Sequence, residues 1–160
     1  MRRSQADLEA ECEKLRNELS LARMALIGIA SPEFQDLFHG IFSCKRREEA
    51  YEWQRFATEK IIERVKPRPA SEMGDVPHNG PRAYCPMCGG SSGNIYQIQG
   101  FAHPEGLRRH LEGSFNARQC VAMKAALAIA IEATEDEARR TLTVGLREAP
   151  RKRGAPRRKR

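Results

Sequence analysis

Aromatic residues are scarce in this sequence, and long apolar runs are missing. Aromatics make up 6% of the 160 residues and charged residues 31%, a balance that favours helices with solvated faces over a densely packed β-sandwich. Uninterrupted apolar stretches such as residues 125–131 are far too short to span a membrane, and the N-terminus has no apolar signal-peptide core. We therefore expect a mainly α-helical protein that is not secreted and lies in the cytoplasm, the nucleoid or the nucleus.

Acidic residues are missing from the C-terminal end of the chain. The net charge is +7, and the last ten residues contain seven basic side chains and no acidic one, so residues 1–150 are neutral overall. Such a charge block predicts a disordered tail over residues 150–160, which either contacts the phosphates of a nucleic acid or serves solubility or localisation. The candidate phosphate contacts of the tail are Arg151, Lys152, Arg153, Arg157, Arg158, Lys159 and Arg160.

A heptad pattern follows a helix-start signature near the N-terminus. Ser4 stands three residues before Asp7, which resembles a capping box. Apolar or small residues then recur at alternating spacings of four and three with charged residues between them, as in a short coiled coil. This leucine stripe consists of Leu8, Cys12, Leu15, Leu19, Ala22, Leu26 and Ile29. The stripe either packs within the chain or pairs with another chain; a homodimer would form through Leu8, Leu15, Leu19 and Leu26.

Two further helical regions are expected on either side of the chain's middle. Ser31 and Pro32 end the first helix, and a longer one is expected over residues 44–65, packed on the first, with Trp53 and Phe56 as core residues. Near the C-terminus, an alanine-rich run predicts a helix over residues 121–131. Thr134 and the three acidic residues after it predict a new N-cap at Thr134, which begins a last helix that runs to about Leu146.

Four prolines and two glycines between residues 66 and 82 predict a linker. The expected organisation is therefore a helical segment over residues 1–66 that either packs within the chain or dimerises, a linker over 67–82, a module with C-terminal helices over 83–149, and the basic tail.

The module after the linker carries the metal-binding pattern. Cys85 and Cys88 are separated by two residues and followed by two glycines, the composition of a tight turn that grips one ion. Residues 95–101 then read as a short strand, and Pro104 opens a helix that carries His110 and ends at Gly113. Because the chain is expected not to be secreted, its cysteines favour metal binding over disulfides. Cys12 and Cys44, which have no cysteine close by in the sequence, are expected to be ordinary thiols.

The spacing of Phe101, Leu107 and His110 resembles that of the Cys-Cys-His-His zinc finger family, over residues 85–120 only. The resemblance implies a small ββα module in which the aromatic residue and the leucine pack under the metal and the histidine is the first helical ligand. The sequence departs from the family in its longer gap after Cys88 and in having Cys120 where a second histidine is usual.

Zn²⁺ is the expected ion, because mixed thiolate and imidazole donors match its softness and its tetrahedral preference. The expected ligands are Cys85, Cys88, His110 and Cys120, with His103 as the competing candidate.

Four protein ligands would close the shell of the metal, so the site is expected to be structural and the protein not an enzyme. A metal-dependent nuclease using His103 or Asn116 is the enzymatic alternative, although the sequence has no phosphate-binding glycine loop or nucleophile elbow. The leading hypothesis is a nucleic-acid-binding regulatory or accessory protein. Its contacts in the module would be Arg108, Arg109 and Arg118. The alternative is a zinc-stabilised adaptor that binds another protein, which the neutral body favours.

Overall fold

The computed structural model describes residues 4–69, 80–92, 99–115 and 117–148. The fold is mainly helical, as expected, with one small antiparallel pair of strands in the described part of the chain. In chain order the elements are α1 (Gln5–Gly28), the 3-10 helix η1 (Pro32–Ser43), α2 (Arg47–Arg64), β1 (Arg82–Ala83), β2 (Phe101–Ala102), α3 (Glu105–Glu112) and α4 (Val121–Glu148). None of the described helices is both long enough and apolar enough to cross a membrane.

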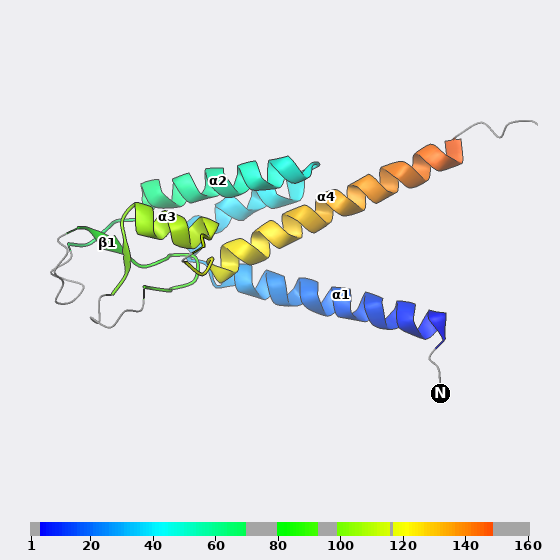
Figure 1. The fold of residues 1–160 in the computed structure, drawn as a ribbon, viewed down its shortest axis with the longest axis horizontal. Coiled ribbons are helices and arrows are strands. Elements are labelled where there is room, and N and C mark those ends of the chain that lie inside the picture. Colours follow the sequence, from blue (N-terminus) through cyan, green and yellow to red (C-terminus); the bar gives the residue numbers. More distant parts are fainter. Residues whose placement is uncertain (1–3, 70–79, 93–98, 116, 149–160) are drawn as a thin grey trace, which may run out of the picture.

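Two long helices diverge from a smaller body that carries the strands. α1 and α4 lie close together where they join the body and separate toward their far ends, while α2, η1 and α3 lie together on the other side of α4 (Figure 1). The N-terminal end of α1 is the end that points away from the body (Figure 1). The body therefore holds one end of each long helix.

α1 begins where the sequence predicts it. The Ser4 hydroxyl accepts a hydrogen bond from the Asp7 amide, and the Asp7 carboxylate accepts one of 3.0 Å from the Ser4 amide, so the capping box is confirmed. The helix packs on α4 and η1, and α2 packs on α4, α3 and η1. The expectation that the helix of residues 44–65 is the main partner of α1 is wrong. The reason lies in α4, whose buried alanines let other helices approach its backbone closely; they are Ala122, Ala125, Ala126 and Ala130.

The core under α2 is built by η1. The buried side chains of η1 are Phe34, Leu37, Phe38 and Ile41, and the Trp53 indole N–H donates a 2.8 Å hydrogen bond to the Leu37 carbonyl. Trp53 is a core residue as predicted, but Phe56 is 56% exposed, so its assignment to the core is wrong. The buried face of α2 runs through Ala57 and Ile61, and Phe56 lies one residue outside it, with the Lys60 ammonium 6.0 Å from its ring centre.

α4 is one continuous helix of 28 residues. The predicted break at Thr134 is wrong: the threonine is buried, and its hydroxyl donates a 2.7 Å hydrogen bond to the Ile131 carbonyl inside the helix. Thr134 is the last buried residue among the α4 side chains whose burial is described, and residues 135–141 are exposed.

The predicted linker is described only at its two ends. The backbones of Arg68 and Arg82 exchange two hydrogen bonds of 2.8 and 2.9 Å. These bonds connect the end of the segment after α2 to β1, so the metal-binding region begins beside α2.

Candidate metal centre

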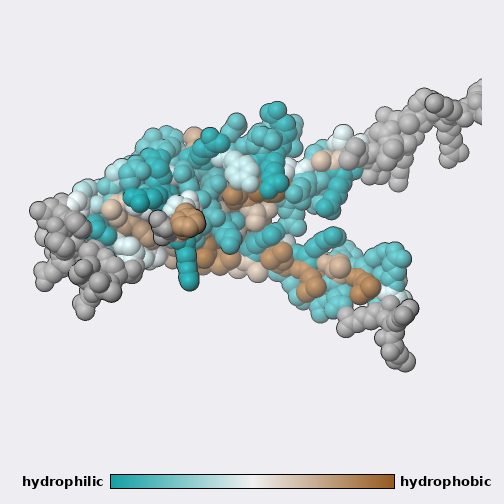
Figure 2. All heavy atoms as spheres, in the orientation of Figure 1, coloured by the Kyte–Doolittle hydropathy of each residue, from teal (hydrophilic) through white to brown (hydrophobic). Residues whose placement is uncertain are grey.

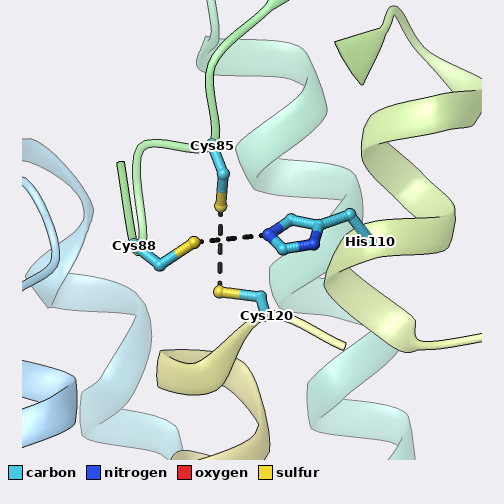
Figure 3. Close-up of side chains that lie close together, drawn as sticks. All are labelled: Cys85, Cys88, His110 and Cys120. Atoms are coloured by element: carbon cyan, nitrogen blue, oxygen red, sulfur yellow. Dashed lines mark hydrogen bonds between the residues drawn. The ribbon is translucent and has the colours of Figure 1, made fainter. Parts of the chain in front are cut away.

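A tight turn after β1 presents the first two cysteines. The Gly89 amide donates to the Cys85 carbonyl at 2.8 Å, and the Cys85 amide donates to the Gly90 carbonyl at 3.0 Å. Gly89 has φ +67°, a conformation that favours glycine. The chain thus folds back on itself within five residues, and both thiols point to the same side (Figure 3).

His110 comes from the last turn of α3, and Cys120 from the residue directly before α4. The Phe101 ring stacks on the His110 imidazole, with ring centres 4.2 Å apart. The Cys120 amide donates a 2.7 Å hydrogen bond to the His110 carbonyl, which fixes the loop between them at its end. The ββα order implied by the zinc-finger resemblance is present, although β2 begins only at Phe101, and residues 95–98 of the predicted strand lie outside the described residues.

The four predicted ligands come together. Their donor atoms all lie within 4.8 Å of one another, and they face a common centre from three different segments (Figure 3). The Cys85 and Cys120 sulfurs are 3.8 Å apart, and the Cys88 sulfur is 3.3 Å from His110 Nε2. A tetrahedral Zn²⁺ with ordinary bond lengths places two sulfurs about 3.8 Å apart and a sulfur and a nitrogen about 3.6 Å apart. The donor set and its spacing therefore fit a tetrahedral metal ion of this size.

The histidine is held in the orientation that a metal ligand needs. His110 Nδ1 lies 3.0 Å from the Arg118 carbonyl oxygen, to which it donates when Nδ1 carries the proton. That hydrogen bond leaves the lone pair of Nε2 directed at the three sulfurs. A backbone carbonyl in this outer position is the usual support for a metal-binding imidazole.

The thiols crowd one another in a mostly buried site. Cys85 and Cys120 are buried, while Cys88 and His110 are half-buried. Hydrogen bonds with Cys120 and Cys88, together with burial, raise the pKa of the Cys85 thiol, whereas hydrogen bonds with Cys120 and Cys85 lower the pKa of Cys88. Burial opposes the charged form of His110, but the Cys120 and Cys88 sulfurs outweigh it and raise the pKa of this imidazole to about 9. A divalent metal at this centre would bind the deprotonated thiols and the neutral imidazole, and its charge would offset the repulsion between the sulfurs.

No family model, curated protein or solved structure matches this chain. The assignment of the site therefore depends on its own geometry and on the chemistry of its four donors.

His103, the competing candidate, lies outside the cluster. Its Nε2 is 3.3 Å from the Ile62 carbonyl at the end of α2, so the imidazole connects the module to that helix. The residue precedes Pro104 at the start of α3.

Of the predicted nucleic-acid contacts, the structure describes Arg108, Arg109 and Arg118. Arg108 is largely covered and forms ion pairs with Glu59 on α2 and Glu105 on its own helix. Arg109 and Arg118 are exposed. The basic residues of the tail lie outside the described residues; they are Arg151, Lys152, Arg153, Arg157, Arg158, Lys159 and Arg160.

One contributor to the site was not identified from the sequence. It is the Arg118 carbonyl, because a backbone acceptor has no side-chain signature. Gly89 and Gly90 were both predicted to form the turn, but only Gly89 has a positive φ. At Gly90, a Cβ atom would lie 3.1 Å from the Cys88 sulfur.

Proposed function

We propose that Cys85, Cys88, His110 and Cys120 hold one structural Zn²⁺, and that the chain is a non-catalytic protein that binds another protein. The observation that carries this proposal is the set of four convergent donors within 4.8 Å. Four protein donors fill a tetrahedral shell and leave no position for water or substrate. Mixed sulfur and nitrogen donors favour zinc over magnesium or calcium, which take oxygen ligands.

The ion would connect three parts of the fold. Cys85 and Cys88 belong to the turn after β1, His110 to α3, and Cys120 to the start of α4. Leu107 and Leu111 on α3 are fully buried, and α3 packs on α2. A metal at this point therefore fixes the base of α4, the helix on which both α1 and α2 pack.

A protein partner fits the described surface better than nucleic acid does. Leu107 and Leu111 bury one face of α3 in the protein interior, so this face is not available to a nucleic acid. The charge of Arg108 is balanced by Glu59 and Glu105, which leaves it unsuited to phosphate. By contrast, α1 exposes its leucine stripe along nearly its whole length, and an exposed apolar stripe on a helix is a typical protein-binding surface.

Nucleic-acid binding is the second candidate function, and it is supported by a different observation. Arg109 and Arg118 are exposed close to the metal centre, and residues 151–160 contribute seven basic side chains. These groups would contact phosphates without reading sequence.

The salt dependence of nucleic-acid binding separates the two candidates. Single- and double-stranded nucleic acid would be titrated with the full chain and with a chain ending at Pro150, with zinc content measured by native mass spectrometry. We expect one zinc per chain in both, and weak binding that disappears with the tail. Tight, salt-sensitive binding by the shortened chain would instead establish a nucleic-acid surface on the body, and a chain without zinc would overturn the metal assignment.

A further inference from the structure

The leucine stripe of α1 is an apolar surface that the fold leaves exposed. Its large side chains are between 39% and 56% exposed: Leu8 48%, Leu15 56%, Leu19 47%, Leu26 39% and Ile29 52%. Apolar atoms run along α1 on the face seen in Figure 2. A stripe of this length on a helix of 24 residues has the dimensions of a coiled-coil interface.

The packing of α1 on α4 uses a neighbouring flank of the helix. Ile27 is buried, and the Arg23 guanidinium pairs with Glu132 of α4 at 2.5 Å. Both residues lie to one side of the stripe on the helical wheel. α4 therefore orients α1 without covering its leucines, and even Leu26, near the base, stays open.

We propose that the leucine stripe is the interface with a second copy of this chain, and that the two α1 helices form a parallel, in-register coiled coil. This deepens the proposed function, on which it rests, by naming the partner. With Leu15 as a d position, the stripe has Cys12, Leu19 and Leu26 at a, and the remaining members at d. Leucines fill four of the seven positions, which suits knobs-into-holes packing of two helices.

The charges beside the stripe select the parallel orientation. The g positions hold Glu11 and Glu18, and the e positions five residues later hold Arg16 and Arg23. A parallel pair places each g residue beside the e residue of the next heptad on the other helix, so every glutamate meets an arginine. An antiparallel pair places g beside g, so it brings no basic residue of the other helix to the two glutamates. Within one chain, Glu18 also pairs with Lys14 at 3.8 Å and Arg23 with Glu132, so the second of these interhelical pairs would be shared with contacts inside each copy.

The fold lowers the entropic cost of this pairing. Three heptads are marginal for two isolated peptides, which must become helical as they associate. Here α1 is already capped by Ser4 and anchored on α4, so little backbone freedom remains to be lost. Because the C-terminal end of each α1 enters its body, a parallel pair places the two metal centres at the same end of the assembly.

The first test compares two exposed leucines of the same helix. Leu19 lies on the stripe, whereas Leu21 is 71% exposed outside it. Analytical ultracentrifugation of the zinc-loaded full chain should give a dimer. Leu19→Ser removes an apolar contact from both copies and should raise the dimer dissociation constant by about 100-fold or more. Leu21→Ser causes the same loss of helix propensity, but it should leave the dimer dissociation constant within about twofold of that of the unchanged chain. Equal effects of the two variants would refute the assignment of the stripe.

The orientation is tested through Cys12. At an a position of a parallel, in-register pair, the two Cys12 residues face each other at disulfide distance. Oxidation with diamide should give a covalent dimer for the full chain and for Cys44→Ser, and none for Cys12→Ser. A dimer without this cross-link would overturn the parallel register. A zinc-loaded chain that stays monomeric at all concentrations would overturn self-association, while leaving the zinc scaffold itself in place.

Discussion

Replacing Cys120 by serine tests how much of the fold depends on the metal centre. Cys120 is fully buried and lies directly before α4, with its sulfur 3.8 Å from that of Cys85. A serine hydroxyl is shorter and does not ionise near neutral pH, so it is a poor zinc ligand. The variant would retain three of the four donors and leave an incomplete shell at the base of the longest helix.

The expected cost is large compared with the stability of a domain this size. Apparent binding free energies of structural zinc are about 10–16 kcal/mol, and whole domains are stable by about 5–15 kcal/mol. Loss of an outer-shell partner of a zinc ligand weakens affinity by about 10–100-fold. Loss of a ligand should cost more, so we expect Cys120→Ser to lower the free energy of unfolding by about 3 kcal/mol or more.

The assay is urea unfolding followed by circular dichroism, in buffered zinc and after chelation. Zinc content would be measured on the same samples. Cys44→Ser is the matched control, because Cys44 is a half-buried thiol far along the chain whose sulfur contacts the Gly40 carbonyl at 3.5 Å. The control should keep its zinc and its unfolding midpoint. The reasoning would be refuted if Cys120→Ser kept one tightly bound zinc, or if chelation left the unfolding curve of the natural chain unchanged.

Three further changes probe the rest of the fold. The Thr58 hydroxyl is buried and has no hydrogen-bond partner among the described residues, so Thr58→Val should raise the free energy of unfolding by about 1 kcal/mol, as measured in urea. A Cβ atom on residue 90 would lie 3.1 Å from the Cys88 sulfur, and Gly90→Ala should therefore weaken zinc by about tenfold or more in competition with a chelating dye, as disturbed outer-shell contacts do. The hydrogen bond from Arg64 lowers the pKa of Asp36. This pair stabilises the fold above the pKa of an unfolded aspartate and loses its effect as the pH falls through the lowered value, so Asp36→Asn should flatten the pH dependence of unfolding below about pH 4.

Local signals in the sequence were sufficient for the helix start and for the cluster of three cysteines and one histidine. The capping box of Ser4 and Asp7 is a contact between residues three apart, and the structure confirms it. The ligand set of Cys85, Cys88, His110 and Cys120 was predicted because a turn, a helix and the donor chemistry each restrict the choice. The cluster is present, and the identity of the ion stays a prediction.

Errors arose where tertiary packing decided the outcome. Phe56 is as apolar as Trp53, but only the face of α2 toward η1 and α4 is covered, and Phe56 is not on it. Thr134 has the side chain of a helix cap and acids after it, yet in this chain it bonds a carbonyl within α4 and the helix continues. The exposure of Phe56 and the continuation of α4 through Thr134 both depend on which residues pack against them, and the sequence does not give that information. The dimer and the nucleic-acid contacts remain predictions.

An ion held by Cys120 would lie at the pivot of α4, because this residue directly precedes the helix. A helix of 28 residues extends about 42 Å beyond this ligand, and from residue 135 to residue 141 its side chains are exposed. A rotation of about 10° at the base would move the far end by about 7 Å. In the proposed zinc-bound state, the bond angles around the ion would therefore set where the far end of α4 reaches in space.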